Sequence, residues 1–518
     1  MAVLEAPRPA ASATGLGAPP IATFGTSSQI QLPRWLVLLL LIVGQALLAR
    51  TMSGKPIVAL LHVAVIFGLL MYALAKRNTP LLLLVYAYLP ASEIMWRQSH
   101  APIASGTGPY LLTFCSLIAV GISYPHITLP ARTALLYIGL LLPSSVVTLS
   151  TTGAASRELV VFALAGPITL TALVLLFSQL GITTDLYRRM LWVIVIGGVG
   201  PLAIALTSIA DYIGAGQSLE FNNESNPITS GGFGPVQVSS LLGFTVLAAT
   251  LLIMVERELA PRIFIGIIGI AAMTQSLLTF SRGGMFATAI ALGGLTISQA
   301  KNRRTRTKTF AAVAALLAVG YFLVVPRLDS FTQGKFEERF RTTRTGRTNL
   351  ATSDLDLFRR NMLFGVGPGM AKYRQISYEI CQLRSDRCRT EGSSHTEFTR
   401  MPAEHGIPGV VAIGVMSVLA LQALRRAGPS FGISLSMLLW AIAQMFYANL
   451  RVVAVPFAFA FAFLYIRDPD DPSDEADVAA APSRGPPRPA DRRLGQRAPL
   501  PAGSGSARQL PVQPTRRR

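Results

Sequence analysis

Charged residues are scarce in this sequence: they make up only 14% of its 518 residues, whereas hydrophobic residues make up 51%. The mean hydropathy is +0.47. An ordinary soluble domain carries about 25% charged residues, so this composition excludes that class of protein. We therefore interpret the chain as a protein that spans a membrane several times.

Cysteine and histidine are also rare, with three and five residues in the whole chain. Three cysteines are too few for a disulfide framework. Cys381 and Cys388 lie close together in one polar segment, and we predict a possible local disulfide between them in an oxidising compartment. A metal site at these two cysteines would lack further clustered ligands.

We expect no removable signal peptide, because residues 1–34 are rich in Ala, Pro, Ser and Gly and contain no short apolar core before a cleavage site. The net charge of +20 is spread over loops and over the Pro-rich, Arg-rich residues 467–518. With no single basic domain, we expect no nucleic acid partner. Both end segments have the composition of disordered chain, and the basic tail would attract anionic lipid headgroups.

Long hydrophobic segments are what the sequence does contain. About fourteen of them approach the roughly 20 apolar residues that a transmembrane helix needs. They include Ala134–Ser150 and Val452–Ile466, and also Leu81–Trp96, which Pro90 and Glu93 interrupt. The sequence therefore predicts an all-α polytopic membrane protein with about 12–14 transmembrane helices.

The basic run Lys301–Lys308 fixes the orientation, because cytoplasmic loops keep Lys and Arg. Alternation from this loop places both termini, 1–34 and 467–518, in the cytoplasm. Helices 1–11 then fill 35–326 and helices 12–14 fill 405–466. The polar stretch 327–404 becomes one large, mainly helical periplasmic loop.

Arginines gather on the predicted outer side. Arg282 lies at the outer junction of two spans, where it departs from the positive-inside pattern, and Arg344 and Arg347 belong to an arginine-rich part of the large loop. For Arg282 the plain alternative is a snorkelling arginine, and for Arg344 and Arg347 it is a solvated helix face. Guanidinium groups bind phosphate oxygens through paired hydrogen bonds, so the cluster also suits a lipid pyrophosphate.

Two further polar residues stand near the end of the large loop. His395 is one of the few histidines, and an imidazole titrates near neutral pH and can accept a proton from an attacking hydroxyl group. A lone histidine is more often structural. Glu404 lies where the chain re-enters the membrane, and charge compensation at a helix N-terminus is its plain alternative.

At these residues the chain resembles the O-antigen ligase and polymerase family. Three stretches carry the resemblance: Ser281–Gly284, Arg347 followed by Phe358–Gly369, and His395–Gly409. The sequence departs from the family pattern at Thr396, where the family commonly has Asn.

The resemblance implies a GT-C-like, metal-independent glycosyltransferase of the bacterial inner membrane that uses no cofactor and has its active site on the periplasmic face. The donor would be a glycan linked to undecaprenyl pyrophosphate and the acceptor a lipid or a glycan. His395 and Glu404 would be catalytic, while Arg282, Arg347 and Arg344 would bind the pyrophosphate.

Three functions stay open at this point, and a structural scaffold for an envelope polysaccharide complex is a further alternative. A ligase moves a finished glycan to an acceptor such as a lipid A core, whereas a polymerase joins repeat units of an O-antigen or exopolysaccharide. A transporter or flippase is the alternative from another class, since about fourteen spans and an intramembrane carboxylate such as Glu93 also occur there.

Overall fold

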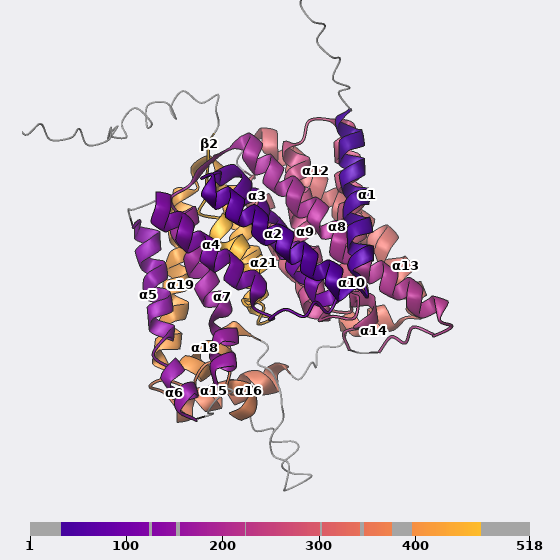
Figure 1. Ribbon diagram of the computed structural model, residues 1–518. Coiled ribbons are helices and arrows are strands. Elements are labelled where there is room, and N and C mark those ends of the chain that lie inside the picture. The colour runs from indigo at the N-terminus through magenta and orange to yellow at the C-terminus, as the bar shows by residue number, and fades with distance from the viewer. Residues whose placement is uncertain are drawn as a thin grey trace, which may run out of the picture. The chain divides into compact units, whose positions relative to one another are not determined.

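The computed structural model describes residues 33–123, 127–151, 156–222, 224–300, 303–341, 347–374 and 396–467. These residues are almost entirely helical (Figure 1). The helices are α1 Arg34–Met52, α2 Pro56–Ala75, α3 Thr79–Gln98, α4 Thr107–Ser123, α5 Leu129–Leu141, α6 Ser145–Thr151, α7 Ser156–Phe177, α8 Thr184–Gly214, α9 Pro235–Val255, α10 Leu259–Leu278, α11 Arg282–Ser298, α12 Arg303–Val319, α13 Val325–Phe331, α14 Lys335–Arg341, α15 Arg347–Arg360, α16 Ala371–Arg374, α18 Glu397–His405, α19 Ile407–Arg426, α20 Phe431–Met445 and α21 Ala454–Phe461. Shorter turns are η2 Ile228–Ser230, η3 Gly320–Val324 and η4 Gly428–Ser430, and the strands are β1 Gly181–Thr183 and β2 Tyr465–Arg467.

Nine stretches of helix among the described residues are long and apolar enough to cross a membrane. Seven of them are α1, α2, α7, α8, α9, α10 and α19, and the other two are Leu129–Thr151 and Thr309–Phe331. The predicted all-α polytopic membrane protein is therefore confirmed. The expected span Ala134–Ser150 is interrupted between α5 and α6, where Pro143 cannot donate a helical hydrogen bond.

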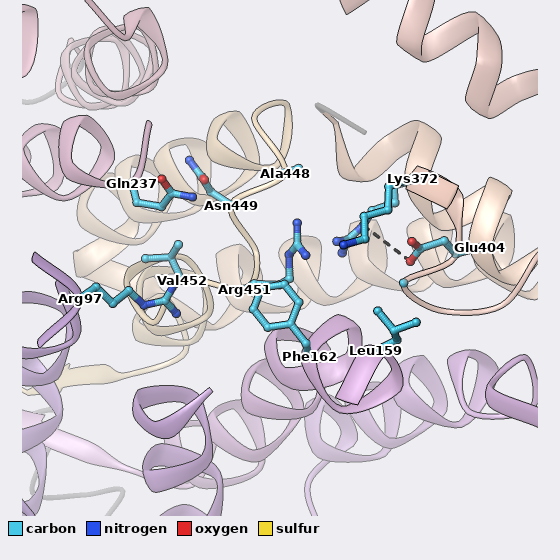
Figure 2. Close-up of a pocket in the computed structure, with 12 residues that line it drawn as sticks. Arg97, Leu159, Phe162, Gln237, Lys372, Glu404, Ala448, Asn449, Arg451 and Val452 are labelled. Carbon is cyan, nitrogen blue, oxygen red and sulfur yellow. Dashed lines mark ion pairs between the residues drawn. The ribbon is translucent and has the colours of Figure 1, made fainter. Parts of the chain in front are cut away.

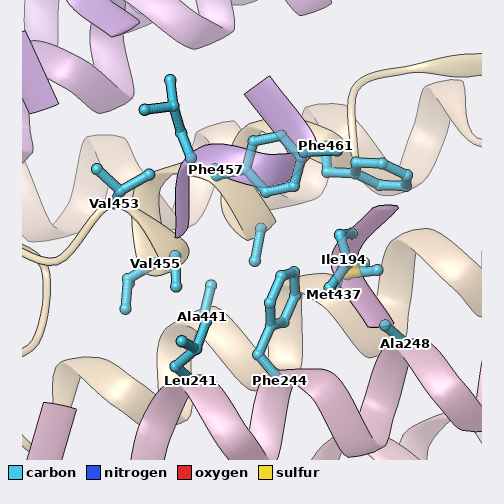
Figure 3. Packing of buried hydrophobic residues seen from close by; sticks show 14 of the residues in the cluster. Ile194, Leu241, Phe244, Ala248, Met437, Ala441, Val453, Val455, Phe457 and Phe461 are labelled. Carbon is cyan, nitrogen blue, oxygen red and sulfur yellow. The ribbon is translucent and has the colours of Figure 1, made fainter. Parts of the chain in front are cut away.

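The structure corrects the expected last span, Val452–Ile466. Its only helix, α21, has 8 residues, which is about 12 Å long and too short to cross a bilayer. Every residue of α21 is buried, and Figure 3 shows Phe457 and Phe461 of this helix packed among side chains such as Phe244 of α9. Protein surrounds this segment, so its backbone need not form one continuous helix.

One end of the helix bundle is held together by contacts between distant segments. Strand β1, which precedes α8, pairs in parallel with β2, so that Gly181 lies opposite Tyr465. At the start of α1, Arg34 forms an ion pair of 2.7 Å with Glu256, which follows α9 and also accepts a hydrogen bond from Trp192 of α8. Helix α1 therefore begins near the connection between α9 and α10. The segment that follows α21 lies beside the connection between α7 and α8.

Candidate active site

A cavity of about 280 Å³ lies where α3, α7, α16 and α18 meet the turn between α20 and α21. Its described lining is rich in basic side chains, with four cations against one carboxylate. Figure 2 shows Arg451 above the ring of Phe162, with Arg97 to one side and Lys372 and Glu404 to the other. The charged lining residues are Arg97, Lys372, Glu404 and Arg451, together with Arg400.

Two of these arginines are paired with buried carboxylates behind the cavity wall. Arg97 lies 2.5 Å from Glu93 on α3, and Arg400 lies 2.5 Å from Glu397 on α18. Arg400 also approaches Glu404, with 3.9 Å between Nε and Oε2. These contacts hold the two guanidinium groups in place.

Arg451 differs from these two arginines, because it has no ion pair with any described residue. Its guanidinium carbon lies 4.6 Å from the centre of the Phe162 ring, which is a cation–π distance. Burial, together with the positive charge of Arg400, lowers the pKa of Arg451 to about 10. It therefore stays charged at neutral pH and is available to an anion.

Two buried donors of the cavity arginines also lack partners in the described part of the chain. The Nε atoms of Arg97 and Arg400 are both buried and make no hydrogen bond there. Buried polar groups in native proteins are nearly always hydrogen-bonded, and an unmet guanidinium N–H is costly. These two Nε atoms are closed to solvent. The excess of positive charge among the lining side chains gives the cavity the chemistry of a phosphate or pyrophosphate site.

A glycine-rich segment holds α18 in its place beside the cavity. Val366 and Gly367 donate backbone hydrogen bonds to the carbonyl groups of Ala403 and Glu404, at 2.9 and 3.0 Å. Gly365 has a φ of +65°, and a Cβ atom there would collide with the backbone of Glu404. This segment is therefore a docking surface for the helix that carries Arg400 and Glu404.

Glu404 and the adjacent His405 point to different surroundings. Glu404 lines the cavity, and burial raises the pKa of its carboxyl group even though Arg400 opposes this shift. His405 is buried against the break between α5 and α6, where its Nδ1 lies 2.5 Å from the Ser144 hydroxyl and 3.1 Å from the carbonyl oxygen of Leu141. A carbonyl oxygen only accepts, so we assign the proton to Nδ1.

Arg282 is the first residue of α11 and is not among the described residues that line the cavity. Its Nη1 donates to the carbonyl oxygen of Arg339 at 3.3 Å. The start of α11 is nevertheless close, because Gln444 donates to the Gly283 carbonyl at 3.5 Å and accepts from Asn449, a cavity residue, at 2.9 Å. The start of α11 and the cavity are therefore connected by a short chain of hydrogen bonds.

The glycines of the Ser281–Gly284 stretch have a packing role. A Cβ atom on Gly284 would collide with the backbone of Ser239 on α9, and one on Gly283 would meet the ring of Tyr447 at 2.7 Å. Small residues let two helices approach closely within a membrane. The glycines thus fix where α11, and with it Arg282, begins.

Four other predicted site residues lie outside the described residues: His395, Arg344, Cys381 and Cys388. For Arg347 the structure describes only the backbone, which begins α15. Helix α15 packs against α18, and Thr399 donates to the buried carboxylate of Asp354 at 2.7 Å. The predicted roles of Arg347 and of the four residues outside the described ranges therefore stay predictions.

Sequence reasoning missed Arg97, Lys372, Arg400 and Arg451. Arg451 carries the same signal that selects Arg282, a lone arginine at the junction of two apolar segments. The other three do not stand out among the many basic residues of the chain. Among the described residues, no group of three His, Cys, Asp or Glu side chains is placed to hold a metal ion.

Comparison with known proteins points to the same part of the chain. The family model described as O-antigen ligase matches residues 271–414, a stretch that runs from within α10 into α19 and contains Arg282, Lys372, Arg400 and Glu404. No curated protein matches the chain. The match supports an O-antigen ligase-like function in surface polysaccharide biosynthesis, with lipid-linked glycans and membrane lipids as the implied partners. Taken with the helical membrane fold and the basic cavity, it supports the assignment of this protein to the O-antigen ligase and polymerase family.

Proposed function

We propose that the protein transfers a glycan from undecaprenyl pyrophosphate to an acceptor hydroxyl group on the periplasmic face of the bacterial inner membrane. The observation that carries this proposal is the basic cavity, whose described lining has four cations against one carboxylate and whose helix α18 lies in the family-matched stretch. A pyrophosphate is the anion that the donor would place there. Arg400 and Arg451 are proposed as its direct ligands, with Arg97 and Lys372 at the sides.

The proposed reaction is an inverting substitution at the anomeric carbon of the donor sugar. The acceptor oxygen attacks this carbon from the face opposite the pyrophosphate and forms the new glycosidic bond. The bond between the anomeric carbon and the pyrophosphate oxygen breaks, and both of its electrons leave with the undecaprenyl pyrophosphate. His395 is the proposed general base that takes the proton of the hydroxyl group, a contribution of about 10² to 10⁴-fold.

The basic side chains would lower the barrier by stabilising the charge that grows on the departing pyrophosphate. Groups that are fixed before the reaction and aimed at developing charge usually give the largest part of a rate enhancement. Arg282, Arg344 and Arg347 are proposed to extend this basic surface toward the large loop. Neither the leaving group nor the proton transfer then requires a metal ion, so we propose metal-independent transfer.

Transfer in a purified system tests the proposal. The full-length protein is incubated, with EDTA, with an undecaprenyl-pyrophosphate oligosaccharide and a set of acceptors, and His395→Ala and Arg451→Gln are compared with the wild type. Arg34→Gln is the matched control, because Arg34 pairs with Glu256 away from the cavity. We expect a product with the wild type and the control only.

The size of the product distinguishes the two activities of the family. A single discrete shift of the acceptor indicates a ligase, whereas a ladder of repeats on the carrier lipid indicates a polymerase. If no donor and acceptor pair gives a product with the wild type, glycosyl transfer is wrong. Wild-type activity in Arg451→Gln would instead remove the cavity from the mechanism.

A further inference from the structure

Two buried carboxylates stand behind the cavity, and the proposed reaction gives them no role. Glu93 on α3 is 2% exposed, and Glu397 at the start of α18 is fully buried. They come from helices far apart in the sequence. Burying a carboxylate is costly unless both of its oxygens find partners, so the partners of these two residues show what the fold gains from them.

The two residues have similar partners, although Arg97 donates a hydrogen bond to Glu93 whereas the contact between Arg400 and Glu397 is an ion pair without hydrogen-bond geometry. One oxygen of Glu93 pairs with Arg97, and the other accepts the backbone N–H of Val453 at 2.7 Å. One oxygen of Glu397 pairs with Arg400, and the other accepts the backbone N–H of Leu450 at 3.3 Å. Each carboxylate therefore joins an arginine of the cavity to the turn of residues 450–453.

That turn carries Arg451. Val453 is the N-cap of α21, so its N–H lies at a helix start where no intrahelical partner is available, whereas Leu450 lies in the turn before that cap. The two carboxylates accept N–H groups on either side of Arg451, at positions 450 and 453. The backbone of Arg451 is thus held from two directions while its side chain faces the cavity (Figure 2).

We infer that Glu93 and Glu397 are positioning residues that hold Arg451 in the geometry in which it binds the phosphate oxygens of the donor. This inference rests on the proposed function. Arg451 lies among like charges with no ion pair to a described residue, and repulsion from Arg400 and Arg97 would displace an unanchored turn. A guanidinium binds phosphate bidentately only when its plane is fixed, and the two anchors provide this.

If Glu93 and Glu397 acted only through their charge, their removal would have the opposite effect on anion binding, so the test distinguishes positioning from charge. Removing a carboxylate adds one positive charge to the region of the cavity and should therefore tighten the binding of an anion. Removing an anchor should weaken it. In Glu93→Ala and Glu397→Ala we expect the Kd for geranyl pyrophosphate to rise about tenfold or more, measured by titration of the full-length protein in detergent.

A double-mutant cycle separates action through Arg451 from independent damage. If the glutamates act through Arg451, Glu397→Ala adds no further loss of affinity to Arg451→Gln, and the same holds for Glu93→Ala. Equal fold-changes in the presence and absence of Arg451 would overturn the inference. Affinity that is unchanged or tighter in both glutamate variants would overturn it as well.

Glu256 supplies the matched control. It is a buried carboxylate that pairs with Arg34 and accepts the backbone N–H of Arg257 at 3.0 Å, so it reproduces the chemistry away from the cavity. Glu256→Ala should lower the Tm and leave the Kd unchanged. A raised Kd in this control would show that loss of any buried ion pair harms binding, and would overturn the inference.

Aspartate variants answer the question if an alanine variant does not fold. Glu93→Asp and Glu397→Asp keep the charge but shorten the side chain by one methylene group, so that one carboxylate no longer reaches both partners. Positioning predicts weaker binding in these variants, and unchanged binding would overturn it. If the wild type binds geranyl pyrophosphate no better than geraniol, the proposed function fails together with the inference. Normal binding by the wild type confines any failure to the inference.

Discussion

At the scale of single residues, Arg451 offers the clearest contrast between charge and geometry. We expect Arg451→Lys to raise the KM for the lipid-linked donor at least tenfold, because an ammonium group is a point charge and lacks the planar fork of a guanidinium. Steady-state transfer assays at varied donor concentration measure this. Arg34→Lys, at the other end of the bundle, should leave the KM unchanged. A normal KM in Arg451→Lys would mean that the cavity needs only charge.

His405 makes stability depend on pH in a defined direction. Burial, together with the nearby positive charge of Arg400, lowers its pKa to about 3, while the unfolded chain keeps a pKa near 6.5. Below pH 6.5 the unfolded state therefore binds the proton more strongly, so this residue's contribution to stability falls as the pH decreases from 6.5 toward 3. The loss is at most about 1.4 kcal/mol per pH unit.

The variant His405→Asn tests this dependence. An asparagine amide can still donate a hydrogen bond to the Leu141 carbonyl, but it does not titrate. Between pH 7.5 and 5 we expect the Tm of the wild type to fall more steeply than that of His405→Asn. Parallel curves would show that another group controls the acid sensitivity.

The residues of the site differ in how far the sequence could predict them. The resemblance of His395–Gly409 to the family selects Glu404, and the structure puts this residue in the cavity, while its catalytic role stays a prediction. Arg97 and Arg400 could not be chosen, because their roles depend on contacts such as that between Glu93 and Val453, which are distant in the sequence. Periodicity and local motifs contain no information on such pairs.

At the scale of elements, the docking of α18 depends on one backbone conformation. Gly365 combines a φ of +65° with close contact to the backbone of Glu404. We expect Gly365→Ala to move α18 and to lower transfer activity about tenfold or more, with a decreased Tm. Gly334 has a φ of +80°, but a Cβ atom there would meet no other atom within 4 Å, so Gly334→Ala is subject only to the strain of the backbone.

The comparison of these two glycine variants separates strain from collision. Strain alone costs about 1–2 kcal/mol and should be similar in both. A larger loss of Tm and of activity in Gly365→Ala supports the docking role. Equal effects in both variants would remove it.

Apolar segments were easier to detect than to interpret. The apolar run Pro56–Ala75 forms the single helix α2, as expected for a helix in contact with lipid, which is apolar along its whole length. Val452–Ile466 has the same composition but forms the short, fully buried helix α21. A continuous apolar run does not distinguish a helix in lipid from a segment inside protein, and only packing against helices such as α9 and α20 decides between them.

At the scale of the whole membrane domain, the first and last described segments each contact a connection between two helices. Arg34 pairs with Glu256 after α9, and β2 pairs with β1 before α8. Arg451 and Glu404 lie in the cavity instead, next to the start of α11. The predicted topology, in which both termini are on the cytoplasmic side and the active site is periplasmic, stays a prediction.

Labelling of single cysteines tests that topology directly. After Cys115, Cys381 and Cys388 are replaced by alanine, one cysteine is introduced at an exposed position, either Thr352 of α15 or Arg189 of α8. A membrane-impermeant maleimide added to cells with a permeabilised outer membrane should label Thr352→Cys. It should label Arg189→Cys only after the inner membrane is opened. The positive-inside rule predicts this orientation from Arg188 and Arg189 in the first turns of α8 and from the basic residues that follow α11. The buried segment α21 leads the chain to β2, which pairs with β1. Labelling of Arg189→Cys in closed cells would reverse the orientation and place the basic cavity on the cytoplasmic side, where periplasmic glycan transfer is impossible.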